Sequence, residues 1–193
     1  ILPLQSGTKT IEVEITGLAP LLMHSAASML SDPSHTLGVK VRRSGETIVR
    51  DAQKEAEKAA YRMKSGELYI PNTAVYGTII NAATAFKFGK KTASYILAGT
   101  IKIQPEQIPL GTKTYEIDVR TAVNRMAGRI VTFRPRIDKW KVKFGLVYNT
   151  AYVEDARHLK AIVEDAGLRM GLLSFRPQHK GPFGTFTVTG WKE

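Results

Sequence analysis

The densest group of residues able to do chemistry is a run of cations in the last third of the chain. Between Arg129 and Lys143 the sequence reads RIVTFRPRIDKWKVK, which holds six basic residues and one acid, Asp138. Successive side chains of a β-strand point to opposite faces, so we expect one face to be apolar and the other cationic. The cations expected on that second face are Arg134, Arg136, Lys139, Lys141 and Lys143. Like charges on a sheet repel one another, and a phosphate backbone would offset that repulsion. The alternative is a solvated face that keeps an edge strand from aggregating.

A second candidate phosphate site is a glycine-rich loop near the C-terminus, GLLSFRPQHKGPFG, at residues 171–184. Glycine lets the backbone approach a phosphate closely, and clustered N–H groups form a concave anion site. Two phenylalanines of this loop, Phe175 and Phe183, are candidates for stacking on bases. An ordinary turn is the plainer interpretation, because glycine and proline favour turns as well. The residues expected to contact phosphate here are Gly171, Gly181, Arg176, His179 and Lys180.

Small, polar and basic residues dominate positions 24–50, and we expect a long loop there. Arg42 and Arg43 in this loop are candidate nucleic-acid contacts, with a solvated charged loop as the alternative. Asp32 is a weak candidate for a catalytic residue, because a carboxylate can ligate Mg²⁺ directly. An aspartate between serine and proline residues more often stabilises a turn.

Motifs that would indicate catalysis are missing from the sequence. The histidines His24, His35, His158 and His179 are scattered, and there is no P-loop, nucleophile elbow or zinc signature. The chain has no cysteine, which excludes disulfides and thiolate metal sites and suits a reducing compartment. We therefore expect a protein that is not an enzyme and that uses no cofactor and no metal. The enzyme class left open is a metal-dependent one that uses Asp32.

Composition and charge narrow the class of partner. With 193 residues, 43% of them apolar and 23% charged, the chain is long enough for a single folded domain. A net charge of +11 indicates nucleic acid or an acidic membrane as the partner. The charge is spread over expected strands and loops and is not gathered on one amphipathic helix, which favours nucleic acid over membrane. No apolar run approaches the ~20 residues that cross a bilayer, and the first residues, ILPLQSG, do not look like a secretory signal. A cytoplasmic protein is expected.

Strands and helices must position these residues. Strict alternation predicts a strand over 10–17, and apolar residues at helical spacing predict one helix that follows Pro71 and another over 154–166. Asn72 or Thr73 is the expected N-cap of the first helix, and Gly89 its expected stop. Gly167 is expected to end the second helix.

The cationic run is predicted to form a β-hairpin over 129–148 with its turn at 137–139, and alternation predicts a last strand over 185–191. Strand, helix, hairpin, helix and strand in this order predict an α+β protein with a ferredoxin-like, RRM-like βαββαβ core and an antiparallel sheet. The single domain would carry its core at about 8–23, 66–89 and 127–193, with insertions at about 24–65 and 90–126.

Three segments together resemble one family. Residues 66–83, GELYIPNTAVYGTIINAA, are similar to its strand–turn–helix signature, a glycine-rich loop precedes the last strand, and an irregular loop follows the first. The family is the RAMP superfamily of ferredoxin-like RNA-binding proteins in CRISPR effector complexes, and the resemblance is closest to the subunits that polymerise along a guide RNA. Two positions depart from it. Asn72-Thr73-Ala74 replaces a Gly-Ser-Ser turn, and Tyr76 replaces a basic residue.

The resemblance implies a ribonucleoprotein subunit for antiviral defence that binds single-stranded nucleic acid, with guide RNA favoured, through its phosphates. It assigns phosphate contacts to the turn that Asn72 and Thr73 form here, where a helix N-terminus offers backbone N–H groups. Copies of the chain would line up head to tail in a filament, with other effector subunits as further partners. The alternatives are a RAMP-like viral or phage protein that binds or anneals single-stranded DNA, a ribonuclease subunit using Asp32, and a coat-like assembly protein.

Overall fold

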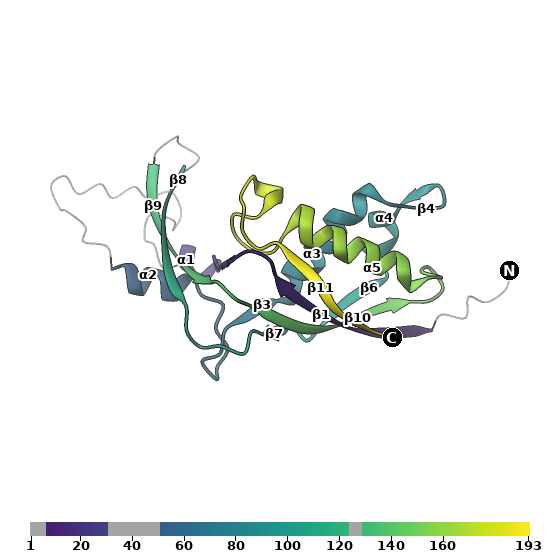
Figure 1. The fold of residues 1–193 in the computed structure, drawn as a ribbon, viewed down its shortest axis with the longest axis horizontal. Helices are drawn as coiled ribbons and strands as arrows, with labels where there is room; N and C mark the ends of the chain where they lie inside the picture. The colour runs from purple at the N-terminus through teal and green to yellow at the C-terminus, as the bar shows by residue number, and fades with distance from the viewer. Residues whose placement is uncertain (1–6, 31–50, 124–128) are drawn as a thin grey trace.

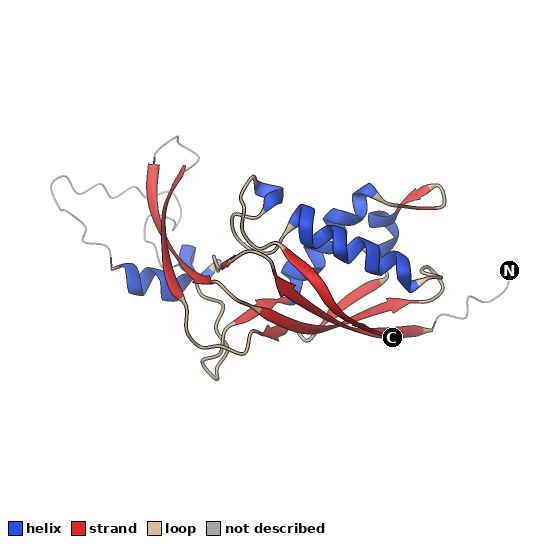
Figure 2. Cartoon of the chain, in the orientation of Figure 1, coloured by secondary structure: helices blue, strands red, loops and turns tan. Residues whose placement is uncertain are grey.

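The computed structural model describes residues 7–30, 51–123 and 129–193, which form a mixed α+β protein with antiparallel sheets (Figures 1 and 2). The largest sheet has four strands in the order β11-β1-β10-β6, and all neighbours in it are antiparallel. Its strands are β1 (Thr8–Gly17), β6 (Ile101–Gln104), β10 (Lys141–Asn149) and β11 (Phe186–Lys192).

One face of this main sheet is buried, because its strands alternate apolar and polar residues. Ile11, Val13 and Ile15 of β1 are fully buried, while Glu12 and Glu14 point to the other face. Two helices, α3 (Asn72–Ala82) and α5 (Ala156–Asp165), cover the buried face (Figure 1). The strand predicted over 10–17 is thus confirmed, and the hydrophobic core lies between the main sheet and these two helices.

The predicted start and stop of α3 are wrong. Pro71 occupies the N-cap position, and the side-chain amide of Asn72 donates instead to the backbone oxygen of Ile103 on β6, at 2.9 Å. The helix ends at Ala82, and a 3₁₀ turn, η1 (Ala83–Ala85), follows it. Gly89 has a φ of +61° and lies between the short strands β4 (Lys87–Phe88) and β5 (Lys91–Thr92).

The predicted end of α5 at Gly167 is also wrong. Asp155 caps the helix by accepting from the backbone N–H of Arg157, and the chain continues past Asp165 as a π-helical turn, η2 (Ala166–Met170). Gly167 lies inside that turn, where a Cβ atom would collide with the backbone oxygen of Phe186 on β11. Glycine is needed there for close packing of the helix on the sheet, and the actual stop is at Gly171, with a φ of +69°.

The predicted hairpin of residues 129–148 does not form. Strand β9 (Arg129–Ile137) pairs with β8 (Glu116–Val123) and with β2 (Leu21–Leu22) in a second sheet, whereas β10 belongs to the main sheet. The chain changes sheets near Trp140, whose indole N–H donates to the backbone oxygen of Ala19 at 2.9 Å. Ile137, Trp140 and Val142 are all buried, and the spacing of three residues between Ile137 and Trp140 fits a change of sheet as well as it fits the predicted turn. Periodicity alone therefore could not detect it.

The β8–β9 ribbon extends away from the main sheet, and α2 (Ala52–Ala59) packs against β9 (Figure 1). A network around Glu57 of α2 ties this region to the start of the ribbon, because Glu57 binds the guanidinium of Arg62 and accepts from the hydroxyl of Tyr115 at 2.8 Å. Within residues 7–30, 51–123 and 129–193, no helix has the length and apolar character needed to cross a membrane. The remaining elements are α1 (Ala27–Leu30), α2 (Ala52–Ala59), β3 (Tyr69–Pro71), α4 (Ala93–Leu97), β7 (Gln107–Pro109) and η3 (Pro177–His179).

Candidate nucleic-acid interface

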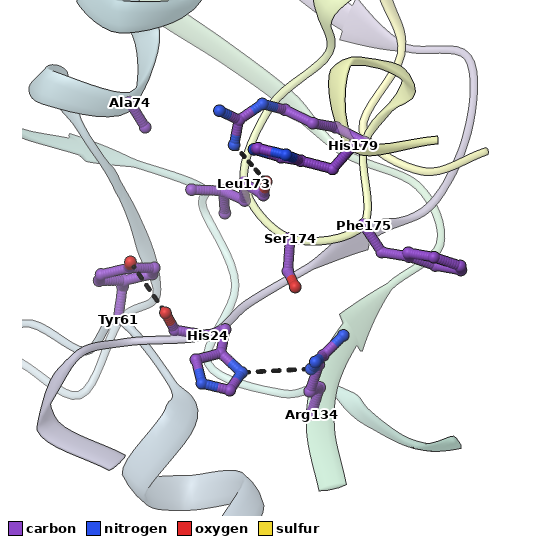
Figure 3. Close-up of a pocket in the computed structure, with 9 residues that line it drawn as sticks. His24, Tyr61, Ala74, Arg134, Leu173, Ser174, Phe175 and His179 are labelled. Carbon is purple, nitrogen blue, oxygen red and sulfur yellow. Dashed lines mark hydrogen bonds between the residues drawn. The ribbon is translucent and has the colours of Figure 1, made fainter. Parts of the chain in front are cut away.

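A cleft of about 540 Å³ lies between the β8–β9 ribbon and the glycine-rich loop, and we call it the Arg134 cleft. In Figure 3, His24 and Arg134 lie opposite Ser174, Phe175 and His179 of the loop. Segments far apart in the sequence therefore meet here, and none of the nine described lining residues carries a carboxylate. These residues are His24, Tyr61, Ala74, Arg134, Leu173, Ser174, Phe175, Arg176 and His179.

Arg134 and His24 form a hydrogen-bonded pair at one wall of the cleft. The Nε–H of Arg134 donates to Nδ1 of His24 at 3.2 Å, and the hydroxyl of Tyr61 donates to the backbone oxygen of His24 (Figure 3). Burial, together with the charge of Arg134, lowers the pKa of His24 below 6.5, so this imidazole is neutral at pH 7 and can accept at Nδ1. Burial also lowers the pKa of Arg134, although a guanidinium remains cationic at neutral pH.

A second guanidinium, that of Arg176, reaches the cleft from the glycine-rich loop. It donates to the backbone oxygen of Leu173 at 2.7 Å and to the side-chain oxygen of Gln178, so the loop itself holds it in place. Burial lowers the pKa of Arg176. Two half-buried guanidiniums in one cleft make an anion a favourable ligand, because it would restore the interactions that each cation loses on leaving water.

Contacts with neighbouring segments fix the shape of the loop. Leu172 and Gly184 are joined by a backbone hydrogen bond of 2.8 Å, and Ser174 donates to the backbone oxygen of Leu22 in β2 at 3.0 Å. The buried hydroxyl of Thr78 on α3 donates to the backbone oxygen of Gly171 at 2.9 Å. The loop is thus anchored to both the second sheet and the helical layer.

The loop also concentrates unusual backbone conformations. Gly171 and Gly184 both have a φ of +69°, and a Cβ atom at Gly181 would collide with the backbone oxygen of Phe175. These glycines are needed for the loop to pack on itself, whether or not a phosphate binds. Non-glycine residues with left-handed backbone are uncommon, and such strain often lies at functional sites. All those in the described ranges lie in this loop, namely Leu173, Phe175 and Lys180.

The structure brings only part of the predicted cationic face to the cleft. Arg134, Arg176 and His179 line it, and Gly171, Gly181 and Lys180 belong to the same loop. By contrast, Arg136 forms an ion pair with Asp138, and both line a separate pocket with Lys139.

Two predicted contacts in α3 also lie elsewhere, since Asn72 and Thr73 line a different pocket beside β6, although their neighbour Ala74 lines the cleft. Three predicted residues fall outside the described ranges: Arg42, Arg43 and the weak catalytic candidate Asp32.

Lys141 and Lys143 lie on the face of the main sheet that the helices leave open. Both bind the carboxylate of Glu14 on the neighbouring strand, at 2.7 and 3.2 Å. Hydrogen bonds from these two lysines lower the pKa of Glu14 to about 2, against an ordinary value of 4.5. The carboxylate of Glu14 therefore neutralises part of the positive charge that the sequence analysis assigned to phosphate binding.

The pH dependence of stability tests this pairing. The pKa of Glu14 is lower in the folded state than in the unfolded chain. The contribution of its ion pairs to the free energy of unfolding is therefore complete above about pH 4.5 and is lost as the pH falls towards 2. We expect Glu14→Gln to lower the free energy of unfolding at pH 7 and to have a much smaller effect near pH 2. Urea unfolding of both proteins at several pH values measures this, with Glu12→Gln as the control on the same face of β1. Equal losses at pH 7 and pH 2 would contradict the pairing.

Two charged residues of β8 that lie next to Arg134 on the ribbon, Asp118 and Arg120, were not among the predicted site residues. The Nε–H of Arg120 donates to the carboxylate of Asp118 at 2.7 and 2.9 Å, and the guanidinium lies 4.7 Å from the ring centroid of Phe183. The alternation in EIDVR, with charges at 116, 118 and 120, was the available signal for a strand with a charged face. It could not show that this strand pairs with β9.

A scan against protein-family models finds no match to this chain, and a comparison with curated proteins also finds none. Over the parts of the chain that the structure describes, no group of three or more histidine, aspartate and glutamate side chains is placed to hold a metal ion. The site is thus described by its own geometry, which is a cleft lined by the guanidiniums of Arg134 and Arg176 with the ring of Phe175 at its wall.

Proposed function

We propose that this protein binds single-stranded nucleic acid, with RNA as the favoured ligand, and holds the phosphate backbone in the Arg134 cleft. One observation carries the proposal. Two half-buried guanidiniums, Arg134 from β9 and Arg176 from the glycine-rich loop, line one cleft, and none of its described lining residues carries a carboxylate. Guanidiniums bind phosphate oxygens through paired, charge-assisted hydrogen bonds, which are stronger than bonds between neutral groups.

The aromatic pair of the loop supports single strands as the ligand. Phe175 is 38% exposed and lines the cleft, and its ring centroid lies 5.9 Å from that of the buried Phe183. Stacking of one base on an exposed aromatic side chain contributes about 1–3 kcal/mol and tolerates any base. Binding is therefore expected to depend little on sequence and steeply on salt.

We propose further that the main sheet with α3 and α5 is a ferredoxin-like core of the RAMP type. Chain order supports this, because α3 lies between β1 and β6 and α5 lies between β10 and β11, which corresponds to βαββαβ. The antiparallel order β11-β1-β10-β6 is compatible with that unit. On this proposal the β8–β9 ribbon belongs to an insertion, and copies of the chain line up head to tail along a guide RNA in the cytoplasm.

The nucleic acid that co-purifies with the protein tests the proposal. The protein is purified without a high-salt wash, its ultraviolet absorbance ratio is recorded, and the bound material is treated with ribonuclease or deoxyribonuclease. We expect RNA of uniform length, protected within a multimer. Protected DNA would instead support the viral or phage alternative. A clean monomer without affinity for single strands at low salt would overturn the proposal.

A further inference from the structure

Asp118 is a buried carboxylate beside a cleft that otherwise suits an anion. Only 7% of its surface is exposed, and the register of the ribbon places it directly opposite Arg134 on β9. Arg120 lies two residues further along β8 and therefore on the same face of the ribbon. A carboxylate here would repel a bound phosphate, so its presence requires another explanation.

The contacts of Asp118 supply that explanation. Both of its oxygens accept from Nε of Arg120, which leaves the terminal nitrogens of that guanidinium outside the ion pair. The guanidinium lies over the ring of Phe183, and the side chain of Arg120 remains 40% exposed. Arg120 is thus held between the buried carboxylate of Asp118 and the ring of Phe183 in the glycine-rich loop.

Asp118 also acts on Arg134. Burial lowers the pKa of Arg134, the charge of Asp118 raises it, and the charge of Arg120 lowers it. The carboxylate therefore lets two guanidiniums lie close together on one face of the ribbon, where each would otherwise repel the other.

We propose that Arg120 is a further nucleic-acid contact of the Arg134 cleft, and that Asp118 is a positioning residue that orients Arg120 and Arg134 towards the phosphates. The inference rests on the proposed function and names residues within the same site. The ligand of Arg120 is a phosphodiester of the strand that passes the cleft, because a guanidinium held at Nε still presents its terminal N–H groups as a fork.

Replacing Asp118 with Asn gives a test in which two explanations predict opposite signs. Removing a negative charge beside a polyanion should tighten binding if Asp118 only repels it. If Asp118 positions the arginines, binding of a fluorescent single-stranded RNA should weaken by roughly tenfold, as expected for the loss of a charged hydrogen bond. The slope of log affinity against log salt should also become shallower by about one, because fewer phosphates are neutralised. A role in stability alone would not change that slope.

Two further variants complete the test. Asp138→Asn removes the carboxylate that pairs with Arg136 outside the cleft, and we expect it to change affinity by less than about twofold. Arg120→Lys keeps the charge and loses the planar fork, so it should weaken binding nearly as much as Asp118→Asn. This variant also serves as the test if Asp118→Asn does not fold.

The outcomes separate this inference from the function on which it rests. If the unaltered protein binds RNA and both Asp118→Asn and Arg120→Lys bind equally well or more tightly, the positioning role is wrong and the proposed function stands. If the unaltered protein binds no single strand at low salt, the proposed function fails and the inference fails with it.

Discussion

Replacing Arg134 with Ala is expected to weaken the binding of single-stranded RNA by about 10- to 100-fold, as for the loss of one or two hydrogen bonds to a charged group. Arg134 is half-buried in the cleft, where a bound phosphate would be less screened by water than on an open surface. The slope of log affinity against log salt should fall by about one. Fluorescence anisotropy over a series of salt concentrations measures both quantities, and equal losses are expected for RNAs of different sequence.

Arg136→Ala is the matched control, because Arg136 lies on the same strand and the same face of the ribbon. Its guanidinium binds Asp138 and lines another pocket, so we expect less than about a threefold change in affinity. Both variants remove one positive charge, and any difference between them isolates the cleft from the net charge of the protein. Equal losses in the two variants would mean that the whole cationic surface, and not the cleft, attracts the strand. Urea unfolding midpoints should confirm that both variants fold.

Replacing Gly184 with Ala is expected to destabilise the protein by about 2–5 kcal/mol, since the new methyl group adds a steric clash to backbone strain. Gly184 has a φ of +69°, and a Cβ atom there would collide with the backbone oxygen of Leu172. The two residues are hydrogen-bonded across the base of the glycine-rich loop, so the clash should also displace Arg176 and Phe175 and weaken RNA binding. Urea unfolding and anisotropy measure the two effects.

Gly89→Ala separates the clash from the backbone strain. Gly89 has a similar φ of +61°, but a Cβ atom there would meet nothing within 4 Å. We expect a loss of about 1–2 kcal/mol from the left-handed backbone alone, with RNA affinity unchanged. Equal losses of stability in the two alanine variants would mean that close packing of Gly184 against Leu172 does not stabilise the protein.

The glycines and the arginines contribute different properties to the glycine-rich loop and the cleft beside it. The glycines determine whether the loop can close on itself, and the arginines determine what it can bind once closed. Leu173, Phe175 and Lys180 add left-handed backbone to the same loop, so its conformation depends on the anchors to β2 and α3 more than on local preference. A protein with a correctly folded core could therefore still lack the cleft.

Local patterns in the sequence determined the main elements. Alternation in residues 10–17 and helical spacing in α3 and α5 depend on neighbours a few positions away, and the structure has a strand and helices there. Helix ends were predicted less well, because Asn72 and Gly167 make contacts with β6 and β11 that no local pattern contains. The net charge of +11 likewise follows from composition alone.

Only the tertiary structure decided which cations share a site. The five cations from Arg134 to Lys143 were expected on one face of a hairpin. Because β9 belongs to the second sheet, however, Arg134 lines the cleft, while Lys141 and Lys143 of β10 bind Glu14 of β1. The physical reason is that a charge is offset by whatever lies a few ångströms away in space, and in a sheet that neighbour comes from another strand. Strand parity is a local property, whereas the choice of partner strand is not.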